Sequence, residues 1–586
     1  MTFQMTWRYL GRMFGYAPVL STLHAIGWTI FAFTGLVQGW AARSLFDRLE
    51  DGTSSYGWLL WVLLGITALD TLIWLSAGYS EIRMRFTMST LLRTNLLRAV
   101  FQRPGAVSLG GPIGDTINRF RDDVYAAEDA LDWRDEIVMN GIVALVAFGV
   151  LIWLDPVIAL ATVLPMIALT ILARRVSNRL GRLRAVSRQA SSDVSGAIGD
   201  LIAGIATLQS AGATGRALGH FRQLGQHRQH AAVLDQVAGK LVEATGSNLV
   251  AIGTGGIMLL GAGRLHSGAM SIGDFVLFVM YFAWVTNFVT DLGRFLAEYR
   301  RASVSIERLN TLVDDPDPYV LTRHVPIHLR GPMPEPESTD APVVAPLERL
   351  EIDRLTCMHA DGRQGVTDIS LTVERGHLVV VTGPVGAGKS TLLRAIMGLL
   401  PIDSGAVRWN GEVVDDPARQ MVPPRAAWIG QTPRVFTDTL RANVLLGAND
   451  ERLDDAIDRA MLRPDIATFP DGIETQIGSR GVRLSGGQIQ RTATARMLAR
   501  EADLLVIDDL SSALDVETEA ALWARLREDG DTTCLVVSHR RAALARADLI
   551  VMLDAGRIVA QGSLHEVLES SEIMRRFWHG KEAPSL

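Results

Sequence analysis

The sequence predicts a chain of two parts: an all-α domain with six membrane-spanning helices, followed by an α/β domain that carries a phosphate-binding loop. Three observations predict this order. Long apolar runs are confined to the region before residue 300, a Pro-rich stretch follows them, and strand and helix signals then alternate. With 586 residues, of which 48% are hydrophobic, the chain is too long for one domain and too apolar for an ordinary soluble protein.

The first part contains six apolar runs, each long enough to cross a bilayer. They are predicted at His24–Ala42, Trp58–Gly78, Val138–Leu154, Pro156–Ala173, Gly246–Gly263 and Asp274–Thr290. A single run of this kind is also typical of a buried helix in a large soluble protein. Several of the six have Trp or Tyr at an end, where these side chains prefer the interface between lipid and water. The pattern therefore favours a membrane domain, with lipid as a partner.

Two of the connections between these runs are long and polar. Residues 79–137 and 174–244 contain few helix breakers, so at about 1.5 Å per residue each has room for two projecting helices of roughly 35 Å. Gly and Pro at Pro104–Gly114 and Ala211–Gly215 predict where each hairpin turns. The second connection has an excess of arginine, which places the long connections, both termini and the second domain in the cytoplasm, with the spans in the plasma (inner) membrane.

Few polar side chains interrupt the spans. Asp70 is ionisable, and such a group faces either a cavity or a polar partner on a neighbouring helix. We give a structural hydrogen bond more weight than contact with a substrate or ion. The aromatic residues Trp28, Phe31, Trp284 and Phe288 either line an apolar cavity or face lipid, and the sequence leaves both interpretations open.

Between the two parts, Asp314–Pro346 is rich in proline and acidic residues, a composition typical of an extended linker. We therefore divide the chain into residues 1–310, 311–346 and 347–586. In the last part, apolar segments predict strands of a parallel sheet that is covered by helices. The expected strands are Leu350–Met358, Thr367–Val373, Leu378–Val381, Leu504–Ile507 and Cys534–Val537, with a helix at Thr391–Leu400.

The phosphate loop follows the strand Leu378–Val381. Its residues are Gly383, Pro384, Val385, Gly386, Ala387, Gly388, Lys389 and Ser390, which fit G-x-x-x-x-G-K-[ST], and Thr391 begins the helix. Glycines let successive backbone N–H groups face phosphate oxygens, and the helix N-terminus favours negative charge. Lys389, one of three lysines in the chain, is expected at the β- and γ-phosphates, and the Ser390 hydroxyl at Mg²⁺. The flanking strand and helix argue against a chance match.

Two further strands end in polar residues. Leu504–Ile507 leads into Asp508 and Asp509, a carboxylate pair within reach of Mg²⁺ and an attacking water. Cys534–Val537 leads to His539. An isolated His is most often structural, but a His at this end of a core strand can also contact a γ-phosphate. A third segment places a Gly-Gly turn before a helix, another anion-binding geometry. It consists of Leu484, Ser485, Gly486, Gly487 and Gln488.

In this order, the motifs resemble those of an ATP-binding cassette (ABC) transporter half of the exporter type, and the resemblance covers nearly the whole chain. Gln431 and Ser512–Asp515 also match the family pattern. The implied fold is an all-α six-helix transmembrane domain followed by an α/β P-loop nucleotide-binding domain. The implied cofactors are ATP and Mg²⁺, with Ser390, Gln431 and Asp508 as metal ligands.

The resemblance also implies a partner. In this family two nucleotide-binding domains bind ATP head to tail, so the signature Leu484–Gln488 of this chain acts on the site of a second half-transporter. Gly111–Phe120 and Ala211–Ala217 are the expected contact segments between the projecting hairpins and the nucleotide-binding domains. ATP binding would close the dimer and hydrolysis would reopen it, which alternates access to the spans.

Two positions depart from the family pattern. His359 stands where an aromatic residue usually stacks on adenine, and we assign it that contact. Asp509 stands where the general base is normally Glu; the resemblance implies catalysis by Lys389, Asp509 and His539, but the shorter carboxylate predicts slow turnover. The favoured interpretation is an exporter of a small or amphipathic molecule, working as a heterodimer with unequal sites. A slow homodimer, an ATP-sensing regulatory subunit and an importer with the exporter fold are the alternatives.

Composition excludes several other classes of protein. A net charge of −6 gives no indication of nucleic acid binding. Two cysteines, Cys357 and Cys534, are too few for a disulfide framework or a cysteine metal cluster. The first 20 residues lack the pattern of a cleaved signal peptide. The sequence does not indicate which molecule is transported.

Overall fold

The protein is described by a computed structural model that divides into two compact units. It describes residues 2–578 apart from 53–55, 108, 110–112, 180, 333–344, 359–364, 479–480, 510–515 and 527–530, with backbone only at some positions of 169–182 and 241–250 and at 516, 518, 526 and 577. One unit comprises Met1–Val100 and Gly111–Gly331, and the other comprises Phe101–Gly110 and Pro332–Leu586.

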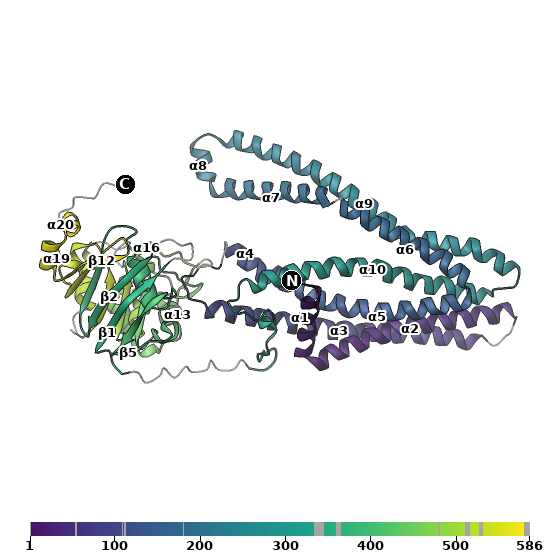
Figure 1. The fold of residues 1–586 in the computed structure, drawn as a ribbon, viewed down its shortest axis with the longest axis horizontal. Helices are drawn as coiled ribbons and strands as arrows, with labels where there is room; N and C mark the ends of the chain where they lie inside the picture. The colour runs from purple at the N-terminus through teal and green to yellow at the C-terminus, as the bar shows by residue number, and fades with distance from the viewer. Residues whose placement is uncertain are drawn as a thin grey trace. The chain divides into compact units, whose positions relative to one another are not determined.

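The regular secondary structure described in the first unit is helical (Figure 1). Its helices are α1 (Phe3–Tyr16), α2 (Pro18–Glu50), α3 (Gly57–Gln102), α4 (Ile113–Asn118), α5 (Val124–Leu154), α6 (Pro156–Arg179), α7 (Gly181–Ala203), α8 (Ile205–Ser210), α9 (Thr214–His266) and α10 (Ile272–Asn310), with a π-helical turn η1 (Arg119–Asp123) before α5. In the described residues, four segments are long and apolar enough to cross a membrane: α2, α3, Ile113–Leu154 and α10. They contain four of the six predicted spans; the other two lie within α6 and α9, so the count of six stays a prediction.

The second long connection forms the predicted hairpin. Figure 1 shows α7 and α9 running side by side, with α8 near their turn. Helix α8 ends at Ser210 and α9 begins at Thr214, inside the predicted break Ala211–Gly215. The first predicted break also coincides with a helix end, because α3 stops at Gln102 and α4 begins at Ile113.

The beginning of α10 is held by the last turns of α2. The Gly273 N–H donates to Asp47 Oδ1 at 3.1 Å, and the Ile272 N–H donates to Glu50 Oε2 at 3.0 Å. Carboxylates are favourable here because the first N–H groups of a helix lack partners within it. A Cβ on residue 273 would collide with Asp47, so only glycine fits this approach. We call this junction the α2–α10 clamp.

Two polar features predicted from the sequence receive partners in the helical unit. Gln38 donates to Asp70, so a hydrogen bond from a neighbouring helix satisfies one oxygen of this carboxylate. The beginning of the predicted linker packs against this unit: Leu321 is buried, and Asn95 Nδ2 donates to its carbonyl oxygen at 2.8 Å. Tyr16 likewise donates to Val325 O at 2.7 Å. The region Asp314–Gly331 is therefore not a free linker.

The second unit is an α/β domain with two main sheets (Figure 1). Its strands are β1 (Arg349–Cys357), β2 (Val366–Glu374), β3 (Leu378–Thr382), β4 (Ser404–Trp409), β5 (Glu412–Val413), β6 (Ala426–Ile429), β7 (Asp438–Thr439), β8 (Gln476–Ile477), β9 (Leu504–Asp508), β10 (Thr533–Val537), β11 (Leu549–Asp554) and β12 (Arg557–Gly562). Its helices are α11 (Lys389–Ile396), α12 (Pro417–Gln420), α13 (Leu440–Leu445), α14 (Leu453–Arg459), α15 (Arg463–Ile466), α16 (Gly486–Leu498), α17 (Val516–Leu526), α18 (Arg541–Leu544), α19 (Leu564–Ser570) and α20 (Glu572–Trp578).

The sheet topology corrects one part of the prediction. Strands β1 and β2 exist where expected, but they pair antiparallel in a separate sheet of order β2-β1-β4-β5. The other sheet has the order β12-β11-β3-β10-β9-β6, and its inner strands are parallel. Strand β3 is buried on both faces: Leu378 and Val380 pack into one hydrophobic cluster, and Val379 and Val381 into another. Burial of both faces explains its continuous apolar sequence.

A short segment from the first predicted turn belongs to the α/β unit. Phe101–Gly110 clusters with this unit, and the Ala106 N–H donates to Leu399 O at 3.0 Å. This segment immediately precedes Gly111–Phe120, the contact segment expected from the sequence. Ala211–Ala217, the other expected contact segment, lies in the helical unit.

Candidate nucleotide-binding site

Four of the predicted motifs lie at one edge of the six-stranded sheet. Strands β3, β10, β9 and β6 are adjacent and parallel, so their carboxyl ends meet at the same edge. Directly after these ends come the phosphate loop, His539, the pair Asp508 and Asp509, and Gln431. In parallel α/β sheets this edge is where ligands bind. The topology therefore assembles one site from segments separated by more than a hundred residues.

The phosphate loop has a backbone that requires glycine. Gly386 and Gly388 have φ of 84° and 95°, the left-handed region that disfavours side chains. Gly388 precedes α11, and no side chain caps this helix, so its first backbone N–H groups are available to an anion. The Lys389 ammonium donates to Gly383 O at 2.8 Å and to Pro384 O at 2.7 Å. Burial lowers the pKa of Lys389, and the charges of Asp508 and Asp509 oppose this effect.

Asp508 and Ser390 form the part of the site that fits a magnesium ion. Ser390 Oγ donates to Asp508 Oδ1 at 2.9 Å, while Oδ2 is buried without a hydrogen-bond partner in the described part of the chain. Burial raises the pKa of Asp508, against the hydrogen bond from Ser390 and the charge of Arg394. A buried carboxylate oxygen without a hydrogen bond is costly, and a divalent cation between it and a hydroxyl would offset that cost. Ser390 and Asp508 thus fit Mg²⁺.

Asp509 and Gln431 lie next to this pair. Gln431 Nε2 donates weakly to Asp509 Oδ2, at 3.5 Å, and the Asp509 N–H donates to Val537 O at 3.1 Å. Asp509 is 7% exposed and has φ of 53°, which is uncommon outside glycine and indicates a constrained turn directly after β9. His539 is exposed, and its neighbour Ser538 is fixed by an N–H bond to Val381 O at 3.2 Å.

The signature segment begins helix α16 with a capping box. Ser485 Oγ accepts from the Gln488 N–H, and Gln488 Oε1 accepts from the Ser485 N–H at 2.9 Å. Ser485 and Gly486 are exposed, while Leu484 packs against the hydrophobic core. The segment therefore presents a rigid, exposed helix N-terminus. Such a helix end can bind a phosphate group of a nucleotide that is held by a second chain.

Sequence reasoning missed three supporting groups. Arg394 NH2 lies 4.0 Å from Asp508 Oδ2. Asp465 receives hydrogen bonds from both Arg491 and Gln488, which fixes the first turn of α16. Glu519, buried at the start of α17, pairs with Arg540 beside His539. No short motif marks these residues, because their partners come from distant segments. Two predicted groups, His359 and Ser512–Asp515, lie outside the described residues.

Comparisons with known proteins identify both parts of the chain. The family described as ABC transporter transmembrane region matches residues 19–289, and the family described as ABC transporter matches residues 366–512. An ATP-dependent lipid A-core flippase of Burkholderia thailandensis is 27% identical over 440 residues, 74% of this chain and 71% of the flippase. ATP-binding cassette sub-family B member 6 of Rattus norvegicus is 30% identical over 346 residues, 58% of this chain and 39% of that protein.

A solved structure extends the likeness to the whole chain. A bacterial Atm1-family ABC exporter with ATP bound superposes with a TM-score of 0.75 at 20% identity, covering 96% of this chain and 99% of that one. At this identity the likeness shows the fold. The chain therefore belongs to the ABC transporter family: it is an exporter-type half, with one transmembrane region fused to one ABC ATPase domain. The predicted fold class and family are confirmed.

Proposed function

We propose that this chain uses ATP hydrolysis to export a small or amphipathic molecule by alternating access. The observation that carries the proposal is the shared sheet edge, where Lys389, Ser390 and the pair Asp508 and Asp509 meet within a chain that also has a transmembrane region. Lys389 and the backbone N–H groups of the loop would bind the phosphates. Ser390, Gln431 and Asp508 would hold Mg²⁺, which neutralises phosphate charge during transfer.

The same proposal assigns roles to the remaining site residues. Asp509 would orient or deprotonate the attacking water, and His539 would stabilise the γ-phosphoryl group. His359 would stack on adenine. The loop residues Gly383 to Gly388 and Thr391 would line the phosphates, and Leu484 to Gln488 would complete the site of a second half-transporter. The helix N-terminus at Ser485 supports this role, because Ser485 and Gly486 are exposed and can be reached by a second chain.

A finer proposal concerns the partner. Asp509 is one methylene shorter than Glu, which retracts the carboxylate by roughly 1 Å, and such a displacement costs on the order of 10²-fold in rate. We therefore favour a heterodimer in which the partner supplies the fast site and the signature of this chain completes it. Purification of this chain alone tests the idea. A stable dimer that hydrolyses ATP on the order of several times per second would contradict it and support the homodimer.

Transport direction is tested in membrane vesicles of known orientation. We propose that both termini and the ATPase domain face the cytoplasm from the plasma (inner) membrane, supported by the arginine excess of 174–244. ATP supplied to inside-out vesicles should then drive accumulation of a labelled compound from a panel of lipids, peptides and organic cations. Accumulation only in right-side-out vesicles loaded with ATP would indicate an importer. ATP binding with neither hydrolysis nor accumulation would indicate a regulatory subunit.

A further inference from the structure

A cavity of about 390 Å³ lies where helices α2, α3, α5 and α10 of the helical unit meet. Its size falls in the range that binds drug-sized molecules. The side chains of His24, Glu81, Asp132, Asp135 and Glu136 line it, and we call these five residues the acidic cluster. The remaining lining consists of the aromatic residues Trp28, Phe31 and Trp284 together with Ala25, Ala32, Met139 and Asn140. Neither the nucleotide site nor its predicted chemistry uses any of these residues.

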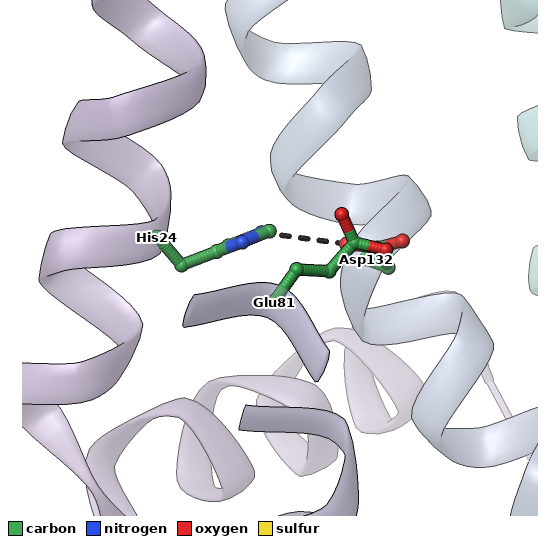
Figure 2. Close-up of side chains that lie close together, drawn as sticks. All are labelled: His24, Glu81 and Asp132. Atoms are coloured by element: carbon green, nitrogen blue, oxygen red, sulfur yellow. Dashed lines mark ion pairs between the residues drawn. The ribbon is translucent and has the colours of Figure 1, made fainter. Parts of the chain in front are cut away.

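The acidic cluster is joined by ionic contacts across three helices. Figure 2 shows the His24 side chain pointing from α2 toward Asp132, with Glu81 beside them. His24 Nε2 lies 3.3 Å from Asp132 Oδ1. Arg85 approaches both carboxylates, at 3.9 Å from Glu81 and 3.8 Å from Asp132, and it also pairs with Asp129 at 3.2 Å.

Carboxyl groups outnumber cationic groups around the acidic cluster. Arg134 pairs with Asp135 at 2.6 Å, and Glu136 hydrogen-bonds Asn140. The carboxylates of the acidic cluster and of Asp129 make five, and the basic groups around them in the described residues are three guanidinium groups, Arg85, Arg134 and Arg294, and the imidazole of His24. Carboxylates that are withdrawn from water without enough cationic partners are costly, so this part of the cavity fits a ligand that carries positive charge.

Two buried atoms of the cluster also lack partners. His24 is 1% exposed, and its Nδ1 has no hydrogen-bond partner among the described residues. Asp135 is 9% exposed, and its Oδ2 is likewise unpaired within the part of the chain that the structure describes. Both residues line the cavity, so their unused capacity is available to a molecule bound there.

Three aromatic side chains also line the cavity. Trp28 and Phe31 follow His24 along one face of α2, and their rings lie edge to face with centroids 5.6 Å apart. Trp284 reaches the cavity from α10, and it packs so closely on Gly35 that a Cβ there would collide with the indole. Faces of Trp and Phe attract cations through their ring quadrupole, most strongly where water is excluded.

We propose that this cavity binds an organic cation, an amphipathic molecule with an amine or other positively charged group, as the transported substrate. The charged group would lie against the acidic cluster and the apolar body against Trp28, Phe31 and Trp284. A divalent metal is the competing ligand, because His24, Glu81 and Asp132 offer ligand atoms within 4.8 Å of one another. A metal ion would use neither the volume nor the aromatic side chains. The assignment as substrate rests on the proposed export function.

Equilibrium binding of tetraphenylphosphonium to the full chain in lipid nanodiscs tests the proposal without nucleotide. Tetraphenylborate has nearly the same size and the opposite charge, and empty nanodiscs correct for partition into lipid. We expect one saturable site for the cation and none for the anion. Glu136→Gln, which keeps the shape of the side chain, should weaken binding about tenfold. Trp284→Ala should weaken it to a similar extent, and Trp284→Phe less.

The matched control is Asp122→Asn, which removes one carboxylate from the segment just before α5 but lies exposed and does not line the cavity. It should leave binding unchanged. Absence of saturable cation binding, or binding that none of the cavity variants weakens, would overturn the proposal. The proposal would also be overturned if the protein bound Zn²⁺ but not tetraphenylphosphonium, and if Glu81→Gln abolished the Zn²⁺ binding.

ATP hydrolysis, measured separately, distinguishes this inference from the proposed function. Hydrolysis without cation binding would overturn the inference and leave the transporter proposal standing. Cation binding without hydrolysis or transport would support the cavity as a cation site and contradict the proposed export.

Discussion

The two units of the molecule each contain a cluster of carboxylates, and the surroundings of these clusters differ. At the sheet edge, Asp508 and Asp509 lie close to the ammonium of Lys389 and the hydroxyl of Ser390. In the helical unit, the carboxylates of the acidic cluster outnumber the cationic groups around them and face tryptophan and phenylalanine rings. The first cluster combines carboxylates with an ammonium, whereas in the second the carboxyl groups outnumber the cationic groups.

The comparison teaches that the surroundings of a carboxylate decide which ligand it accepts. A lysine, backbone N–H groups and a carboxylate pair together suit an anion that carries its own divalent cation, as a nucleotide does. A surplus of carboxylates beside aromatic faces suits a single positive group attached to an apolar body. The four changes below alter one side of this contrast at a time.

The largest effect is expected for Lys389→Ala. Removal of the ammonium leaves the phosphates without their side-chain cation, so affinity for ATP should fall by on the order of 10²-fold or more. Labelling by an ATP photoprobe measures the loss. Lys240→Ala removes another lysine far along the chain and should leave labelling intact. Equal labelling of the two variants would remove the phosphate-loop assignment.

The second effect is a reversal of charge in the cavity. Glu136→Lys removes one carboxylate and adds an ammonium, so binding of tetraphenylphosphonium should fall by about 10²-fold. Nanodisc binding measures it, and Asp122→Lys makes the same change of charge outside the cavity. If both variants weaken binding equally, the effect arises from net charge and not from the cavity.

A smaller effect is expected for Asp509→Glu. The longer side chain restores the reach of the general base at this chain's own slow site, so ATP hydrolysis by the proposed heterodimer should rise modestly, by up to about twofold. Phosphate release gives the rate, and Asp509→Asn, which keeps the shape without the charge, should lower it. A rate that falls with Glu and stays unchanged with Asn would show that Asp509 does not act on the water.

The smallest effect is one of stability. Because burial raises the pKa of Asp508, the folded protein holds this proton more tightly than the unfolded chain. The protonated Asp508 therefore stabilises the fold below the ordinary aspartate pKa. This stabilisation is lost as the pH rises through the raised pKa of Asp508 in the folded protein. At pH 7 the carboxylate is therefore a net cost, and Asp508→Asn should stabilise the nucleotide-free protein by about 1 kcal/mol while abolishing Mg²⁺-dependent hydrolysis at this chain's own site.

Thermal unfolding in EDTA at neutral and acidic pH measures this difference. The midpoint of the variant should exceed that of the parent by a few degrees at pH 7, and the difference should shrink on acidification. Asp416→Asn, which changes an exposed aspartate of the same unit, serves as control. A midpoint that falls for Asp508→Asn at pH 7 would mean that the charged form is stabilised by the fold.

Local patterns in the sequence predict much of the nucleotide site but little of the cavity. Strands β3, β9 and β10 were predictable because they are buried on both faces and hence continuously apolar. Strand β1 was assigned to the wrong sheet, although its alternating burial is typical of a strand with one buried face. The predicted helix Thr391–Leu400 ends early, at Ile396, where Gly398 adopts φ of 65°.

The acidic cluster could not be predicted because its members are distant in sequence. Glu81 and Asp132 lie on different helices of the first long connection, and only the packing of α2 against α3 and α5 brings His24 to them. The aromatic residues Trp28, Phe31 and Trp284 were recognised as cavity candidates, but their polar counterparts were not. Asp70, the polar residue that the sequence emphasised, pairs with Gln38 as the structural interpretation expected.

The α2–α10 clamp limits how this domain moves. Its two backbone hydrogen bonds are joined by an ion pair between Arg43 and Asp274 at 2.7 Å, so three ties hold the two helix ends together. Neither helix can slide or rotate against the other at this end without breaking all three. Trp28 of α2 and Trp284 of α10 line the same cavity away from this junction, so a change in the separation of the two helices there requires bending of a helix and not sliding of one along the other.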